Sequence, residues 1–152
     1  MIRVATLDDV EILVKYNILL AKEAKNINLI KESVKSGAIS VLKEKFKGTY
    51  YIYEIDKEPI GFTYVTPFWN AAYNKDWWLI NNIYLENKYR TKKAINNFFN
   101  YLYNLGKDLN IGGIKLFTTD AIISPVYVDN NIWTENIDLK LYEVIFTHFG
   151  QI

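Results

Sequence analysis

Residues 80–95 read Ile-Asn-Asn-Ile-Tyr-Leu-Glu-Asn-Lys-Tyr-Arg-Thr-Lys-Lys-Ala-Ile, and they carry the strongest indication of the fold. It begins inside an apolar run, 77–85, that is long enough for a central strand. A polar turn at 86–90 follows, and apolar residues then recur at helical spacing over 91–105. Because 114–119 is again rich in strand-forming residues, the stretch predicts a strand–helix–strand unit whose two strands are parallel.

The elements before this unit complete the predicted fold. Residues 2–6 alternate like a short strand, and amphipathic helices are expected at about 10–21 and 29–42. Two β-rich segments, 49–55 and 60–66, are joined by a polar turn and predict an antiparallel hairpin. The expected order is therefore β-α-α-β-β-β-α-β, which gives an α/β (α+β) fold class.

Two regions are harder to interpret. Residues 67–76 carry many aromatics and are predicted to form a loop between strands. In the C-terminal part, Pro125 interrupts any helix that starts near Asp120. Residues 138–149 fit an amphipathic helix, which we favour, but their alternation also fits a strand.

Composition limits the possible classes of function. The chain has 152 residues, half of them hydrophobic, which suits a single domain over 1–152 and excludes global disorder. A net charge of +1 argues against bulk binding to nucleic acid or to anionic membranes. The absence of cysteine and the single histidine, His148, exclude thiol nucleophiles and histidine-rich metal sites, so no metal is predicted. No secretory signal or membrane span is recognisable, so we expect a cytoplasmic protein.

The turn before the helix at 91–105 is the best candidate for a binding site. A helix start offers unpaired backbone N–H groups and a partial positive charge. Lys88, Arg90, Lys92 and Lys93 add cations at the same place, and this combination suits a pyrophosphate. The simpler alternative is a solvated basic turn at the start of a surface helix. A nucleic-acid site built on the same short patch ranks last, because the net charge is small.

At these residues the chain resembles the GNAT superfamily of acyl-CoA-dependent N-acetyltransferases. Residues 83–85, Ile-Tyr-Leu, followed by 89–95, Tyr-Arg-Thr-Lys-Lys-Ala-Ile, are similar to the family's central strand and its Arg/Gln-x-x-Gly-x-Gly/Ala loop. The start of the chain, the Gly-x-Tyr-Tyr-x-x-Glu pattern at 48–54 and the Trp-Trp-Leu-Ile run at 77–80 also fit a subgroup of this family. The resemblance covers about residues 1–119 and implies a GNAT-like mixed, mostly antiparallel sheet with helices on both faces.

The resemblance implies acetyl-CoA as the cofactor. The end of the central strand, Ile83, Tyr84 and Leu85, would bind the pantetheine arm through its backbone. Amides of the following loop would hold the pyrophosphate, and they belong to Arg90, Thr91, Lys92, Lys93, Ala94 and Ile95. A neutral amine would then attack the thioester directly, a base would remove the amine proton through water, and a tyrosine would protonate the departing thiolate.

The chain departs from the family pattern in its loop and in its candidate base. The two glycines expected in the loop fall on Lys93 and Ile95, so the pyrophosphate loop is degenerate. Asn81 and Asn82 stand where a carboxylate base would help, and an amide cannot accept the proton. Water-mediated proton transfer to Glu54 or to Asp120 is the alternative.

Two tyrosines compete for the catalytic role. Tyr142, in Leu-Tyr-Glu at 141–143, resembles the family's tyrosine motif and is our candidate, and Tyr127 is its rival. For the acceptor pocket we select Trp69, Tyr73, Trp78 and Asn81, since aromatic rings attract an ammonium group. Ordinary packing is the alternative for each aromatic.

The sequence thus predicts an acetyl-CoA-dependent N-acetyltransferase for a small amine or amino-acid-like acceptor. The runner-up is a catalytically inactive GNAT-like domain that binds CoA or another protein. We also expect a homodimer, because the C-terminal part is too short for the family's last strands and would leave a sheet edge exposed.

Overall fold

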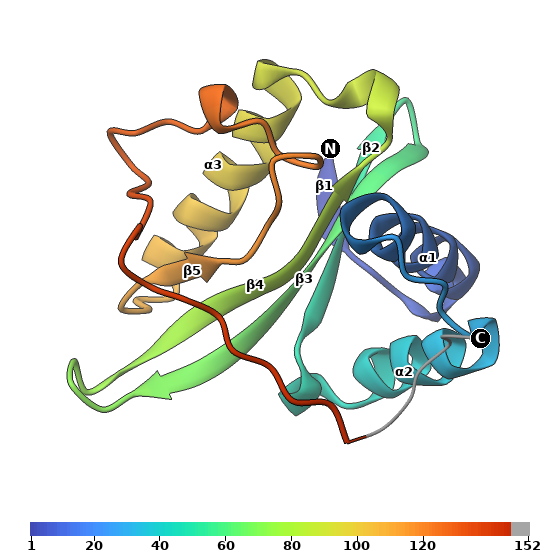
Figure 1. Cartoon of the computed structure of the whole chain (residues 1–152), viewed down its shortest axis with the longest axis horizontal. Helices are drawn as coiled ribbons and strands as arrows, with labels where there is room; N and C mark the ends of the chain where they lie inside the picture. Colours follow the sequence, from blue (N-terminus) through green and yellow to red (C-terminus); the bar gives the residue numbers. More distant parts are fainter. Residues whose placement is uncertain (147–152) are drawn as a thin grey trace.

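The computed structural model describes residues 1–146 and contains one five-stranded sheet (Figure 1). Its strands follow each other in chain order, and they are β1 (Ile2–Val4), β2 (Thr49–Ile55), β3 (Glu58–Asn70), β4 (Lys75–Leu85) and β5 (Ile114–Leu116). Neighbouring strands are antiparallel except β4 and β5, which are parallel. The structure confirms the predicted mixed, mostly antiparallel sheet and its parallel unit.

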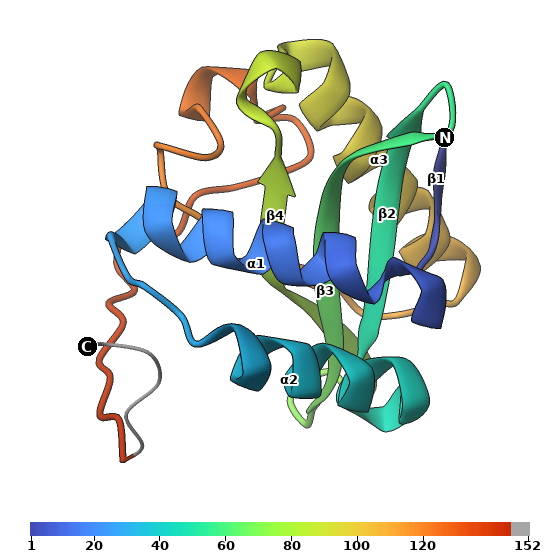
Figure 2. The same cartoon turned by 90° about the vertical axis from the view of Figure 1, so that its right-hand side faces the viewer.

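Helices cover both faces of the sheet, as predicted. α1 (Val10–Lys25) and α2 (Lys31–Lys43) lie on one face, and α3 (Lys92–Asp108) lies on the other (Figure 1). Figure 2 shows α1 and α2 side by side across the strands. Because β2 is covered on both faces, five successive residues of this strand are buried instead of alternate ones. The fully buried side chains come from both layers and from the sheet, and they include Leu13, Tyr16, Ile52, Phe62, Ile80, Ile95, Phe98 and Leu102.

The β3–β4 hairpin is longer than predicted, and the loop expected at 67–76 is wrong. β3 continues to Asn70 and β4 starts at Lys75, so only a tight turn separates them. Aromatic side chains extend the pairing because they pack across strands: the Phe68 and Trp77 ring centres lie 6.2 Å apart. The hairpin therefore projects as an arm beyond the rest of the sheet (Figure 1).

An irregularity in β4 separates this strand from β5. Tyr64 of β3 pairs with Asn82 and the next residue, Val65, pairs with Ile80, so Asn81 is an extra residue that forms a bulge. The pairing of β4 with β5 ends at Ile80 and Leu116, at the same level. Beyond that point the two strands diverge, which is why β5 is shorter than the strand predicted at 114–119.

The C-terminal part of the described chain is largely irregular. Apart from a 3-10 turn at Pro125–Tyr127, residues 117–146 form neither helix nor strand. The helix predicted at 138–149 is therefore wrong for 138–146, and its remainder, with His148, lies outside the described residues. Figure 1 shows the end of this segment crossing in front of β4 and β3. A helix here would have no surface for its apolar face, since side chains such as Leu139 and Val144 are 68% and 75% exposed.

Candidate functional site

A cavity of about 370 Å³ opens where β4 and β5 diverge. It lies between the second half of α1, the bulge of β4 and the segment that follows β5. Its lining residues are Asn17, Leu20, Ala21, Ala24, Lys25, Ile27, Leu29, Asn81, Asn82, Ile83, Phe117, Thr118, Thr119, Ile122 and Leu141. Because the two strands diverge, a ligand in the cavity can reach the middle of the sheet.

Three asparagines at this cavity are oriented by hydrogen bonds. The Nδ2 of Asn17 donates to the carbonyl oxygen of Leu13 at 2.9 Å, so its Oδ1 accepts from the Nδ2 of Asn82 at 3.1 Å. The Nδ2 of Asn81 donates to Thr66 Oγ1 at 2.8 Å and to the Leu79 carbonyl. Because both donating groups are in use, the Oδ1 atoms of Asn81 and Asn82 remain as hydrogen-bond acceptors at the bulge.

Charge is scarce around the cavity. Among the described residues that line it, Lys25 is the one charged side chain, and no carboxylate or histidine is present. The hydroxyl oxygen of Thr119 is buried and has no hydrogen-bond partner within residues 1–146. A buried hydroxyl without a partner is unfavourable, and Thr119 also belongs to the lining of the cavity. In the same part of the chain, no cluster of three potential metal ligands was found.

The first turn of α3 presents two free amides. Thr91 caps the helix: its Oγ1 accepts from the Ala94 amide at 3.2 Å and its carbonyl accepts from the Ile95 amide at 3.0 Å. The amides of Lys92 and Lys93 have no acceptor within the described chain. The bulky residue at the position of the second expected glycine does not obstruct this turn, since the Ile95 side chain is fully buried in the core.

Arg90 points inward, which the sequence pattern did not suggest. Its Nη2 pairs with Glu23 Oε2 at 2.5 Å, and its Nε donates to the Leu85 carbonyl at 2.7 Å. The guanidinium carbon lies 5.1 Å from the centre of the Tyr84 ring, and the Tyr84 hydroxyl donates to Glu23 Oε1 at 2.9 Å. Burial and the Glu23 carboxylate raise the pKa of Tyr84 to about 12. Arg90 thus links α1 to the turn, and the outward cations of this turn are Lys88, Lys92 and Lys93.

The structure separates the four predicted acceptor residues. Asn81 lines the cavity. Trp78 is 9% exposed and belongs to the hydrophobic core, whereas Trp69 and Tyr73 are 59% and 65% exposed on the projecting β3–β4 arm. The arm carries these two rings away from the bulge because the strand pairing persists to its tip.

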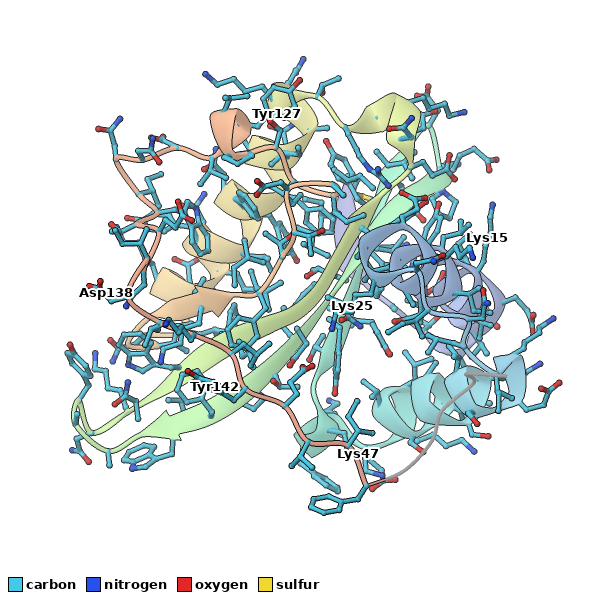
Figure 3. All side chains as sticks on the ribbon, in the orientation of Figure 1. Lys15, Lys25, Lys47, Tyr127, Asp138 and Tyr142 are labelled. Carbon is cyan, nitrogen blue, oxygen red and sulfur yellow. The ribbon has the colours of Figure 1, made fainter. Side chains whose placement is uncertain are left out.

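Neither candidate catalytic tyrosine lines the cavity. Tyr142 (Figure 3) is 85% exposed, although its neighbour Leu141 contributes to the cavity wall. Tyr127 is partly buried against the core. Of the two candidate bases, Glu54 is 7% exposed and paired with Arg3, and Asp120 is exposed outside the cavity lining.

Sequence reasoning did not select Lys25, Asn82, Thr118 or Thr119 as binding residues. One signal was available: Asn17 is a polar residue on the otherwise apolar face of α1, and it lines the cavity. The other residues come from separate segments, and their convergence depends on the bulge. In residues 1–146, no helix has the length and apolar character needed to span a membrane.

Comparisons with solved structures support one fold. A possible acetyltransferase from Clostridium difficile 630 superposes with a TM-score of 0.79 at 29% identity, covering 95% of this chain and 97% of that one. A predicted acetyltransferase from Clostridium acetobutylicum, solved with acetyl-CoA, gives a TM-score of 0.72 at 21% identity over 94% and 95% of the two chains. A GNAT family acetyltransferase from Staphylococcus aureus gives 0.69 at 14% identity over 95% and 98%.

The sequence comparisons are negative: no protein-family model matches the chain, and no curated protein matches it. The structural similarity nevertheless extends over nearly the whole chain and includes the parallel β4–α3–β5 unit. These neighbours are described as a possible, a predicted and a GNAT family acetyltransferase, which supports acyl transfer at the level of the fold. The chain therefore has the fold of the GNAT superfamily of acetyltransferases.

Proposed function

We propose that the protein is an acetyl-CoA-dependent N-acetyltransferase that acts on a small amine or amino-acid-like acceptor by direct attack on the thioester. The observation that carries this proposal is the bulge at Asn81, where β4 and β5 diverge and the cavity opens. A cavity between two diverging strands can admit a narrow acyl chain from one side and an amine from the other. Acetyl-CoA, when bound, supplies the activated acetyl group.

The residues present fit such a cofactor at the start of α3. The unpaired amides of Lys92 and Lys93 can donate to phosphate oxygens, and the two lysine side chains add positive charge there. Ala94 and Ile95 would contribute no free amide, because Thr91 already accepts from both. The buried backbone of Ile83, Tyr84 and Leu85 leads from the bulge to this turn and is the proposed path of the pantetheine arm.

At the bulge, the chain's own residues can orient an amine. The free Oδ1 atoms of Asn81 and Asn82 accept hydrogen bonds from N–H groups, but an amide does not take up a proton. The amine must therefore lose its proton to water before or during attack. We retain Tyr142 as the candidate proton donor to the thiolate on its Leu-Tyr-Glu motif alone, and the role requires its exposed side chain to turn toward the cavity.

Isothermal titration calorimetry with CoA tests the binding step. We expect one-to-one binding, weakened about tenfold when Lys92 and Lys93 are both changed to Glu, because like charge repels the pyrophosphate. Changing Lys107, at the other end of α3, to Glu is the matched control and should have little effect. Absence of CoA binding at millimolar concentration would overturn the proposal.

A second candidate is a GNAT-like domain that binds CoA or a partner protein without catalysis. The observation that favours it is the lack of a carboxylate or histidine among the described residues that line the cavity. Turnover of acetyl-CoA with a panel of amines distinguishes the two functions. CoA release that depends on an amine supports the enzyme, and tight CoA binding without any turnover supports the alternative.

We also propose that the protein forms a homodimer. β5 pairs only with β4 within residues 1–146, so its outer edge is unpaired, and unpaired edges favour association. Residues 137–146 also carry exposed apolar side chains that a second chain can cover, including Leu139, Tyr142 and Phe146. Light scattering should give the mass of two chains, and a monomeric mass at all concentrations would contradict the proposal.

A further inference from the structure

The lining of the cavity is specific enough to suggest a class of acceptor. One wall is apolar and is formed by the α1 side and by the segment after β5, with Leu20, Ala21, Ala24, Ile27, Leu29 and Ile122. The side chains of Asn81 and Asn82 line the same cavity at the bulge, with their amide oxygens unused by the protein. A ligand that fits both kinds of lining combines an apolar body with a group that donates hydrogen bonds.

The charge at the cavity points to a further group on the acceptor. Lys25 is the one charged residue in the described lining, and it lies near the C-terminal end of α1 (Figure 3). Glu23, which is close in sequence, is already paired with Arg90 and bonded to Tyr84. A polyamine or another acceptor with several cations would therefore meet a cation without a compensating carboxylate, whereas an anionic group would be attracted.

A second, independent observation supports an anionic group. The Thr119 hydroxyl oxygen is buried and unpaired in the described structure, and Thr119 lines the same cavity. A hydroxyl can donate one hydrogen bond, and a carboxylate oxygen is a strong acceptor for it. A bound carboxylate would thus satisfy a group that the protein alone leaves unpaired.

Building on the transferase function above, we propose that the acceptor is an apolar amino carboxylate, of which leucine is a simple representative. The amine donates to the Oδ1 atoms of Asn81 and Asn82, the carboxylate accepts from Thr119 and pairs with Lys25, and the apolar side chain packs against the α1 wall. The acceptor class is thereby fixed by residues from α1, β4 and the segment after β5.

The test compares leucine with isoamylamine, which has the same apolar amine without the carboxylate. We expect calorimetry to show leucine binding at least tenfold tighter to the CoA-saturated protein, as charge-assisted hydrogen bonds allow. Lys25→Met should remove most of this preference, and Lys25→Glu should reverse it. Lys22→Met, on the same helix but outside the cavity lining, is the control and should preserve the preference.

Thr119→Val tests the contribution of the Thr119 hydroxyl separately from that of the Lys25 charge. This nearly isosteric change should weaken leucine binding several-fold and leave isoamylamine binding unchanged. The proposal is overturned if isoamylamine binds as tightly as leucine, if neither amine binds at millimolar concentration, or if Lys25→Met leaves the preference unchanged.

Failure of the transferase function is recognised separately. The titration with CoA alone tests that function, and the comparison of the two amines is repeated without CoA. If CoA does not bind but leucine still binds in preference to isoamylamine, the transferase function fails while the assignment of the cavity holds. If CoA binds and the preference is absent, only the assignment of the acceptor fails.

Discussion

The chain has two arginines, Arg3 and Arg90, and they occupy contrasting regions. Arg3 in β1 donates to both carboxylate oxygens of Asp9 at 2.8 Å and to Glu54 of β2 at 2.8 Å. Arg90, in the turn before α3, pairs with one carboxylate, that of Glu23, and otherwise donates to backbone carbonyls such as that of Leu85. Both guanidinium groups therefore face inward, but their surroundings differ.

The difference separates architecture from ligand binding. All charged partners of Arg3 are buried, so this arginine only joins β1, β2 and the start of α1. Arg90 holds the turn that leads into α3, where Lys92 and Lys93 keep free amides. An arginine fork suits fixed internal partners, whereas exposed lysines suit a phosphate that arrives from solvent. Positive charge in one turn can thus have two separate roles.

The largest expected effect is the loss of stability when Arg3 is removed. Arg3→Ala leaves Asp9 and Glu54 buried without their cation and should lower the free energy of unfolding by about 3 kcal/mol. Urea unfolding measures this change. Lys35→Ala removes an exposed ion pair with Glu11 and should cost no more than about 0.5 kcal/mol. Equal effects of the two variants would contradict the contrast between internal and surface charge.

The second effect tests the inward orientation of Arg90. Arg90→Ala should lower the free energy of unfolding by about 2 kcal/mol, because Glu23 and the Leu85 carbonyl lose a partly buried partner. Urea unfolding and CoA calorimetry should be run on the same sample. Unchanged stability together with a large loss of CoA affinity would mean that Arg90 contacts the phosphates instead.

The outward lysines should behave in the opposite way. Lys92→Ala with Lys93→Ala should weaken CoA binding by about 1 kcal/mol and change the free energy of unfolding by less than about 0.5 kcal/mol. Calorimetry with CoA and with a pantetheine fragment measures the difference, since only CoA carries the pyrophosphate. If binding of CoA and of the pantetheine fragment weakened equally, these lysines would not contact the pyrophosphate.

The smallest effect is the pH dependence of the Arg3 cluster. The hydrogen bond from Arg3 lowers the pKa of Asp9 in the folded protein below its unfolded value. The resulting stabilisation is full above the unfolded pKa of about 3.9 and is lost as the pH falls through the folded pKa. The difference in unfolding free energy between the wild type and Arg3→Met should therefore be constant near neutral pH and narrow in acid. If this difference in unfolding free energy instead grew as the pH falls, the lowered pKa of Asp9 could not be its cause.

Local patterns were sufficient for the elements of the fold. Helical spacing located α1, α2 and α3, and the strand–helix–strand pattern gave the parallel pairing of β4 with β5. The arm was missed because aromatics at 67–76 suit a loop and a strand equally, and only their partners across the hairpin distinguish the two. The irregular segment at 138–146 was missed for the same reason, since an apolar pattern forms a helix only when a surface covers it.

The candidate site was only partly accessible to sequence reasoning. Asn81 and the lysines of the α3 turn follow one another along the chain, so a motif could indicate them. Lys25 and Thr119 are far apart in sequence, and no motif links them. The direction of Arg90 depends on Glu23 from α1, which no local pattern brings near.

The order of helices and strands, the excluded chemistries and the basic turn before α3 could be predicted from the amino acids alone, because they follow from composition and from spacing within one segment. The tertiary structure alone decided where the bulge separates β4 from β5, which cations remain outside and which polar groups meet at the cavity. Those features depend on contacts between segments that are distant along the chain, and the free energy of such contacts exists only once the segments have packed together.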